Sequence, residues 1–429
     1  MQKQAKTAKP VSAPLWSFTF VSIVLVALFS SINGNGLQNG IVVLVDSVGG
    51  PTYLSGYISA LFSFSALFAR FVSGNLSDLY GRKKICIVGG IVQVVGTALC
   101  LLIEDPFWIL PFRTLAGFGF GTCITVSAAT IADIVPKTRL GEGVGYHGLA
   151  FAISNAIGPS MGIIFVSEYG GTGLFLSFSL IVMVATVFAI VCPFKPDKKL
   201  VRFQEEHPEL DVMPEQVERK GRKGTPKEEK RGNNPFTRFF FSYIEVKALP
   251  LMLIALFHSS AITVFMSYTA LYTELNGIGG ISAFFIVAAG IMIVIRFSSA
   301  KLIDRYKFTT LMIPSFLLGV IGVLLPIIIP NTVGLITAGV FYGLACAMPQ
   351  PCMVSEALRR APAERRGAAS ATFYIGCDLG VAFGNVLWGY AIDYIGFAGM
   401  YIGSAIDLVI GCIVIMLMFR NKKTGKDAE

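Results

Sequence analysis

The stretch GNLSDLYGRKK, Gly74–Lys84, lies between two long apolar runs and bears most directly on the fold. It places one carboxylate, two glycines and three cations in a short interval of an otherwise apolar region. A turn rich in cations between apolar segments is typical of a loop that joins two membrane helices on the cytoplasmic side. The rest of the chain determines whether this interpretation holds.

The composition agrees with a membrane protein. The chain has 429 residues, of which 54% are hydrophobic and 14% are charged, whereas soluble proteins carry about 25% charged residues. The first residues are basic and polar, and the apolar run that starts near Leu15 is longer than the core of a signal peptide. We therefore expect a polytopic membrane protein without a cleavable signal.

Apolar segments long enough to cross a bilayer recur along the whole chain, since each crossing needs about 20 residues. We predict an all-α fold with twelve transmembrane helices. The predicted spans cover residues 15–45, 53–76, 85–103, 107–132, 143–167, 173–193, 248–273, 279–300, 309–329, 332–356, 368–392 and 398–419.

The cations indicate how these spans are oriented. Of the 35 lysines and arginines, only Arg70, Arg113 and Arg296 lie inside predicted spans. All the others fall in the N-terminus, the tail and connecting segments that would share one side of the membrane. The opposite loops carry acids, such as Asp46 and Glu274. By the positive-inside rule, both termini are predicted to be cytoplasmic, in a multi-pass cell (inner or plasma) membrane protein.

The same distribution bears on partners and cofactors. The net charge of +9 would face anionic lipid headgroups and therefore gives no support for nucleic-acid binding. The eight cysteines are scattered without CxxC or metal-type spacing, so we predict no disulfide, no metal site and no cofactor. The lipid bilayer, protons and a small-molecule substrate are the expected partners, and we expect a monomer.

The opening stretch has a second copy. The segment from Arg70 to Tyr80 aligns with the segment from Arg296 to Tyr306, and the same offset of 226 residues relates Gly117 to Gly343 without a gap. A constant register over this length indicates two six-helix halves that arose by duplication. We predict an N-terminal bundle over residues 1–193, a cytoplasmic loop over 194–247 and a C-terminal bundle over 248–429. The end of that loop, near Asn234–Glu245, is expected to be a short interfacial anchor.

The motif from Gly74 to Lys84 resembles the loop between the second and third helices of the major facilitator superfamily. With twelve spans and two repeats, the resemblance covers the whole chain and implies two bundles related by a pseudo-twofold axis. It also implies that the cluster latches the two halves in the outward-facing state. The latch residues are Gly74, Asp78, Gly81, Arg82 and Lys83, with Asp304 in the second copy, where Ala300, Lys307 and Phe308 depart from the motif.

Two further motifs resemble those of the same family. Arg113-Thr-Leu-Ala-Gly117 is similar to an intramembrane arginine motif linked to proton coupling, although Ala116 replaces the usual glutamine. Gly158-Pro159-x-x-Gly162 is similar to a motif of antiporters. A kinked face of small residues between two helices would produce the same pattern.

Ionisable groups at membrane depth are candidates for function because each one costs at least about 2.5 kcal/mol to insert. Asp378, near the middle of the eleventh span, is the first candidate for a proton carrier. Arg113, Asp407 and the histidines His147 and His258 are further candidates for proton coupling. The alternative for each is a permanent structural pair or hydrogen bond.

Polar and aromatic side chains in the spans are candidates for lining the substrate cavity. Asn35 and Gln38 belong to a polar stripe in the first span, and Gln350 lies where Met348-Pro-Gln-Pro should break the tenth span. Arg70 and Arg296 would bind an anionic cargo group or serve a structural role. Tyr268 belongs to an aromatic stripe with Phe265 and Tyr272, for which core packing is the alternative.

These features favour a secondary active transporter that exports a small organic molecule in exchange for protons by alternating access. A drug, a sugar, or an anionic or zwitterionic metabolite such as a metal chelator would each be compatible. The alternatives are a proton- or solute-coupled importer and a membrane sensor that no longer transports. An enzyme is not expected, because the sequence has no P-loop, nucleophile elbow or metal signature.

Overall fold

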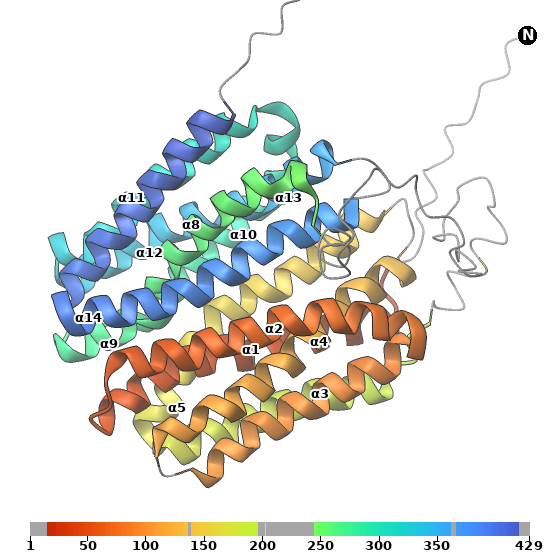
Figure 1. Cartoon of the computed structure of the whole chain (residues 1–429), viewed down its shortest axis with the longest axis horizontal. Coiled ribbons are helices and arrows are strands. Elements are labelled where there is room, and N and C mark those ends of the chain that lie inside the picture. Colours follow the sequence, from red (N-terminus) through yellow and green to blue (C-terminus); the bar gives the residue numbers. More distant parts are fainter. Residues whose placement is uncertain are drawn as a thin grey trace, which may run out of the picture.

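The computed structural model describes residues 15–103, 105–135, 139–195, 202, 244–361 and 366–419. Most of the predicted central loop, including its expected interfacial anchor, lies outside these residues. We refer to the described residues 15–195 as the N-terminal half and to 244–419 as the C-terminal half. Figure 1 shows the two halves side by side, red to yellow and green to blue, with their long helices running in nearly the same direction.

All regular elements in the described ranges are helices. The N-terminal half contains α1 (Phe18–Ser47), α2 (Thr52–Tyr80), α3 (Arg82–Ala98), η1 (Leu99–Leu102), η2 (Pro106–Trp108), α4 (Ile109–Ile134) and α5 (Leu140–Val191). The C-terminal half contains η5 (Val246–Ala248), α8 (Leu249–Ser267), α9 (Thr269–Leu275), α10 (Ile281–Arg305), α11 (Phe308–Ile328), α12 (Thr332–Ala347), α13 (Pro349–Arg360) and α14 (Arg366–Met418).

Nine of the described helical segments are long and apolar enough to cross a membrane, and α10 adds a shorter apolar stretch. Two of the nine, α5 and α14, are about twice the length of one crossing, and each has a glycine with non-helical dihedral angles in its interior. Dividing α5 and α14 at these glycines gives the twelve predicted membrane helices. The sequence placed short loops at these two points, but the chain turns there within one residue.

The two interior glycines occupy equivalent positions of the repeat. Gly170 has φ of 64° and Gly396 has φ of 74°, and they are 226 residues apart. Positive φ is accessible to glycine at no steric cost. The corner between the fifth and sixth spans is therefore reproduced between the eleventh and twelfth.

The repeat is also visible in how helices pack. A Cβ on Gly117 would lie 2.3 Å from the carbonyl oxygen of Phe62, and a Cβ on Gly343 would lie 2.7 Å from that of Ala288. Both members of the second pair are offset from the first by 226 residues. Only glycine permits such backbone approach, so the same α2–α4 contact is repeated as α10–α12.

The predicted antiporter motif forms the contact between α1 and α5. A Cβ on Gly162 would lie 2.0 Å from the carbonyl oxygen of Gly36, and one on Gly158 would lie 3.2 Å from the Cβ of Asn35. Pro159 lies inside α5 between these glycines. The small-residue packing face expected as an alternative is therefore present.

The molecule has two chemically distinct ends. One carries Asp46, Asp105 and Glu274 near the helix termini, and we call it the acidic end. The other carries Arg82, Arg139 and Lys307, and we call it the basic end. In Figure 1 the acidic end lies at the left, near α9, and the basic end lies at the right, near α13.

Two membrane helices are broken. The seventh span is divided into α8 and α9 at Tyr268, and the tenth is divided into α12 and α13 at Met348. The second break was predicted from the prolines that follow Met348, which cannot supply the backbone hydrogen-bond donors of a continuous helix. The first has no proline and was not predicted.

Candidate functional site

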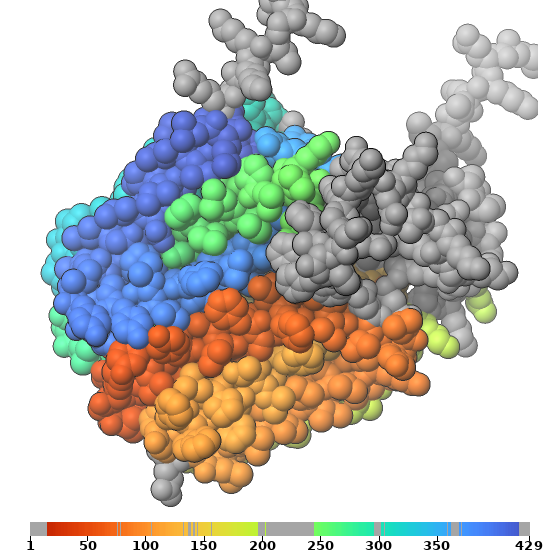
Figure 2. Space-filling model, in the orientation of Figure 1, coloured from red at the N-terminus to blue at the C-terminus, as the bar shows by residue number. Residues whose placement is uncertain are grey.

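The two halves meet along α2 and the part of α14 before Gly396, which lie side by side (Figures 1 and 2). These two segments run antiparallel, because the start of α2 meets Asp393 near the end of the α14 segment. At the acidic end, the carboxylate of Asp393 accepts hydrogen bonds from the backbone nitrogens of Thr52 and Tyr53, at 3.3 and 3.0 Å. Tyr53 stacks on Tyr390 with ring centroids 5.1 Å apart. We call this run of contacts the α2–α14 seam. Its acidic end is closed in this structure.

Asp393 caps the first turn of α2 from the other half of the molecule, so Asp393→Ala should free the amide hydrogens of Thr52 and Tyr53. We expect the first turn of α2 to exchange hydrogen for deuterium faster, as measured by mass spectrometry of the intact protein. Asp105→Ala is the matched control, because Asp105 caps Phe107 at the same end but within the N-terminal half. Unchanged exchange in α2 after Asp393→Ala would contradict a cap between the halves.

Towards the middle of the molecule, amide side chains join the halves. Gln38 donates to the hydroxyl of Ser267 at 2.6 Å, and Ser267 donates to the side-chain oxygen of Asn385, also at 2.6 Å. Asn35, one turn earlier, instead bonds to Ser154 and Asn155 in its own half, at 2.8 and 2.6 Å. The predicted stripe on α1 therefore divides, with Gln38 at the interface and Asn35 inside the N-terminal bundle.

Tyr268 lies at this level and is fully buried. Its hydroxyl donates to the backbone oxygen of Asn385 and lies within 3.0 Å of where a Cβ on Gly56 would be. The other two aromatics of the predicted stripe are also buried: Phe265 packs on Phe284 and Tyr342, and Tyr272 donates to Pro326. The stripe is thus a packed core in this conformation, which was the stated alternative.

Nearer the basic end, an ion pair crosses the seam. Nε of Arg70 lies 3.1 Å from Oδ2 of Asp378, and a second guanidinium nitrogen donates to Oδ1 at 3.4 Å. The exposed fractions of the two side chains are 23% and 18%. Arg70 follows Tyr53 by 17 residues of α2, or about 25 Å at 1.5 Å per residue. The sequence indicates Arg70 and Asp378 as separate candidates, and the structure brings them together.

Two further residues lie close to this pair. The ring of Tyr374, one turn before Asp378, has its centroid 5.8 Å from the guanidinium carbon of Arg70. His147 of α5 is within reach of the charge of Arg70, and its Nε2 lies 3.0 Å from the hydroxyl of Ser127. Groups from α2, α4, α5 and α14 therefore converge at one level of the molecule.

Arg113 lies elsewhere, inside the N-terminal bundle. Its side chain is 1% exposed, donates to the backbone oxygen of Gly34 at 3.4 Å and lies 4.0 Å from the centroid of the Phe62 ring. Its Nε and one terminal nitrogen have no hydrogen-bond partner. It contacts neither Arg70 nor Asp378 in this conformation.

Two other proton-coupling candidates lie inside the C-terminal bundle. His258 is buried, with Nε2 3.2 Å from the backbone oxygen of Ala345. Asp407 accepts a hydrogen bond from Ser260 at 2.7 Å. Both side chains join helices of a single half, unlike Asp378. Gln350 is half-buried in the first turn of α13, and the side chains of Asp78, Arg296 and Asp304 lie outside the described residues.

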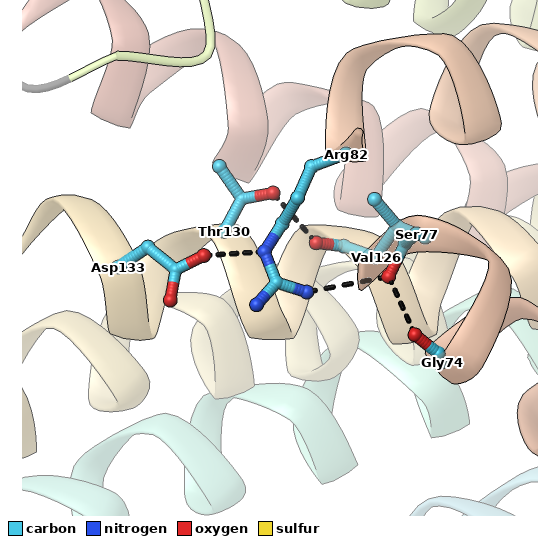
Figure 3. A network of polar contacts seen from close by, with 6 residues as sticks. All are labelled: Gly74, Ser77, Arg82, Val126, Thr130 and Asp133. Carbon is cyan, nitrogen blue, oxygen red and sulfur yellow. Dashed lines mark hydrogen bonds and ion pairs between the residues drawn. The ribbon is translucent and has the colours of Figure 1, made fainter. Parts of the chain in front are cut away.

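The predicted latch loop is ordered within the N-terminal half (Figure 3). Gly81 ends α2 with φ of 93°, as expected for its turn. Arg82 pairs with Asp133 at the end of α4 and donates to the hydroxyl of Ser77 at 3.3 Å, and Lys83 is half-buried in the first turn of α3. A Cβ on Gly74 would meet nothing within 4 Å, so α2 has no close helix neighbour at this glycine in the present conformation.

The basic end has a second local pair near this loop. Arg139 donates to both carboxylate oxygens of Glu142, at 2.8 and 2.7 Å, at the start of α5. This hydrogen bonding raises the pKa of Arg139 above its ordinary value. Both this pair and Arg82–Asp133 lie within one half, so neither of them joins the two halves in this conformation.

Arg82→Gln should lower the free energy of unfolding only slightly, by about 0.2–1 kcal/mol, because Asp133 is 52% exposed and exposed ion pairs contribute little. Thermal unfolding in detergent will measure this change, with a double-mutant cycle through Asp133→Asn to isolate the pair. A loss comparable to that of a buried ion pair would contradict a weak, solvent-screened contact.

The model of the Major Facilitator Superfamily matches residues 23–384 and 309–429. The chain belongs to the Major Facilitator Superfamily. It is therefore a membrane transporter of this type and not an enzyme.

Relatives in this superfamily cover nearly the full chain. An uncharacterized MFS-type transporter of Methanocaldococcus jannaschii, MJ1560, is 24% identical over 92% of this chain and 96% of its own length. Multidrug resistance protein MdtL of Salmonella paratyphi A is 26% identical over 85% of this chain and 82% of its own. Among solved structures, the POT family transporter PepTSo superposes with a TM-score of 0.74 at 11% identity, over 95% of this chain and 98% of its own. That likeness supports the superfamily's fold alone.

Several residues at the interface were missed by the sequence interpretation. Ser267, Asn385 and Asp393 all make contacts between the halves, and Tyr374 lies beside the ion pair. Asp393 could have been found as an acid at a helix end. Ser267 and Asn385 lie in apolar segments and have no local signal that distinguishes them from polar residues inside one bundle. Among the described residues, no cluster of histidine, cysteine and carboxylate side chains could hold a metal ion.

Proposed function

We propose that this superfamily member is a proton-coupled antiporter that exports a small organic molecule by alternating access. The observation that carries the proposal is the Arg70–Asp378 ion pair, because it joins the two halves at membrane depth. A proton on Asp378 removes the charge that holds Arg70, so protonation and separation of the halves are linked at this pair. The names of relatives, which include a multidrug resistance protein, favour export.

The proposal includes an orientation and an assembly state. The basic end faces the cytoplasm with both termini, as the distribution of cations predicts. The closed acidic end then faces outward, and the conformation described here is closed to the outside. The chain acts as a monomer in the cell membrane, with the N-terminal bundle over residues 1–193 and the C-terminal bundle over 248–429 moving against each other.

The test uses the full chain in proteoliposomes with an imposed pH gradient and a panel of labelled amino acids, sugars, carboxylates and amines. Antiport predicts that a transported compound accumulates when the vesicle interior is acidic. A symporter would accumulate it only when the exterior is acidic, and a sensor would move nothing under either gradient. Either result would overturn the proposal. Because both gradient directions are tested in the same preparation, the direction of accumulation relative to the pH gradient does not depend on how the protein is inserted.

A further inference from the structure

The Arg70–Asp378 pair is an imperfect ion pair, and this is informative about the cargo. Only one of its two close contacts, the one to Oδ1, is aligned as a hydrogen bond, and at 3.4 Å it is long. Nε of Arg70 and Oδ2 of Asp378 are shielded from solvent without an aligned hydrogen bond, although they lie 3.1 Å apart. A guanidinium and a carboxylate that match fully form two parallel hydrogen bonds. Each partner therefore retains hydrogen-bonding capacity that a ligand could use.

An anionic cargo would bind Arg70 in place of Asp378. The displaced carboxylate would be left at membrane depth without a counter-charge, and it would take up a proton. Cargo and proton would then bind together, which is the linkage of a symporter. This conflicts with the proton antiport proposed above, on which the present inference rests.

A cationic cargo would bind Asp378 in place of Arg70. Arginine cannot release its proton, so its guanidinium would remain charged and displaced from its only described carboxylate partner. A proton on Asp378 also removes the counter-charge of Arg70, but the neutral carboxyl can still accept a hydrogen bond from Arg70, which a cation that displaces Arg70 does not allow. A simple cation is therefore a poor occupant of this pair.

A zwitterionic cargo provides a counter-charge for both Arg70 and Asp378. Its cationic group binds Asp378 and its anionic group binds Arg70, so every charge keeps a counter-charge. When Asp378 is protonated, the cationic group of the cargo loses its counter-charge and lies near the positive charge of Arg70. Proton and cargo therefore compete for Asp378, as antiport requires. Insertion also moves α2 and α14 apart at this level, which links occupancy to the separation of the halves.

We propose that the cargo is a small zwitterion that inserts between Arg70 and Asp378, with its cationic group on Asp378 and its anionic group on Arg70. Aromatic rings lie on both helices of the seam, one beside the pair and two further along it, where Phe64 and Phe383 are 37% and 55% exposed. Tyr374 lies beside Arg70, and Phe64 meets Phe383 edge to face, with ring centroids 5.7 Å apart, further towards the acidic end. These rings fit a zwitterion that carries an apolar or aromatic side group.

Binding to the purified full chain tests the proposal without requiring transport. The probes are phenylalanine, phenethylamine and 3-phenylpropionate, which share a ring and differ in charge, and γ-aminobutyrate with its amine-only and carboxylate-only counterparts. Each is titrated while tryptophan fluorescence and thermal stability are followed. We expect at least one zwitterion to bind at least about tenfold more tightly than both of its counterparts. Equal or tighter binding of a counterpart, or no binding by either zwitterion, overturns the proposal.

Two variants make the charge assignment specific. Arg70→Gln should remove the advantage of the zwitterion over the amine, because Asp378 is then free for any cation. Asp378→Asn should remove its advantage over the carboxylate, because Arg70 is then free for any anion. A merely structural role would weaken all probes alike, and that result contradicts the assignment. The double variant Arg70→Asp/Asp378→Arg restores the pair in reverse and should recover zwitterion preference if either single variant is poorly folded.

Other titratable groups near the pair must be separated from Asp378 when pH is varied. They are His147 on α5 and Tyr374 and Cys377 on α14. Acidification should weaken zwitterion binding in the unaltered protein and in His147→Gln. The residual zwitterion binding by Asp378→Asn should not change with pH. Zwitterion binding without gradient-driven transport would refute antiport and leave the binding assignment intact. If amines alone accumulated in acid-interior vesicles above the level of protein-free vesicles, antiport would be supported and the zwitterion assignment refuted.

Discussion

Replacing Asp378 with asparagine is expected to reduce proton-driven transport to the level of protein-free vesicles. Asparagine has nearly the same shape and still accepts a hydrogen bond from Arg70, but it cannot carry a proton or balance the guanidinium charge. Because the charge of Arg70 loses its partner, we also expect the free energy of unfolding to fall by about 1–3 kcal/mol. Uptake into acid-interior proteoliposomes and thermal unfolding in detergent measure the two effects separately.

Asp407→Asn is the matched control for that experiment. Asp407 is also a carboxylate of α14, but it bonds to Ser260 within the C-terminal half. We expect this variant to retain coupled transport. If Asp407→Asn abolishes coupling while Asp378→Asn retains it, the proton carrier lies inside the C-terminal bundle and the seam has a structural role.

Gly162→Ala should destabilise the protein strongly, because the added methyl group would lie 2.0 Å from the backbone oxygen of Gly36. A backbone atom cannot move aside as a flexible side chain can, so α1 and α5 would have to separate. Overpacking of this kind costs about 1–3 kcal/mol, and more where the contact is rigid. We expect a lower unfolding temperature and a lower yield of folded protein from membranes.

Gly145→Ala provides a control in the same helix. A Cβ at Gly145 would meet nothing within 4 Å, and alanine is favoured over glycine in a helix by up to about 1 kcal/mol. This variant should therefore unfold at the same or a slightly higher temperature. Equal destabilisation by both substitutions would mean that the α1–α5 contact does not limit stability.

Local chemistry explains which features could be predicted from the sequence. The break after Met348 follows from two prolines, and the turn at Gly81 follows from a glycine between a helix end and three cations. The twelve spans follow from apolar length, and the two halves follow from a constant offset between equivalent residues. Each of these depends on neighbours in the chain or on simple periodicity.

The site was less predictable because its contacts join distant segments in one conformation. Arg70 and Asp378 were each recognised from the cost of burying charge, yet nothing in the sequence shows that they pair. The family resemblance assigns Arg82 to a latch in the outward-facing state, and in the present conformation its described partners are Ser77 and Asp133 in its own half. The break at Tyr268 has no proline or glycine, and it coincides with a hydrogen bond from Tyr268 to Asn385, two residues of the C-terminal half that are far apart in the sequence.

The corners at Gly170 and Gly396 have a consequence for the surrounding lipid. In α14, the segment before Gly396 carries Asp378, whereas the segment after it exposes Ile402, Ile406 and Ile413 on its surface. Because no loop separates the two segments, a tilt of the segment before Gly396 also displaces the segment after it, which moves sideways among the lipid acyl chains. The work of each conformational cycle therefore includes deforming the bilayer, so turnover should vary with membrane thickness and acyl-chain order.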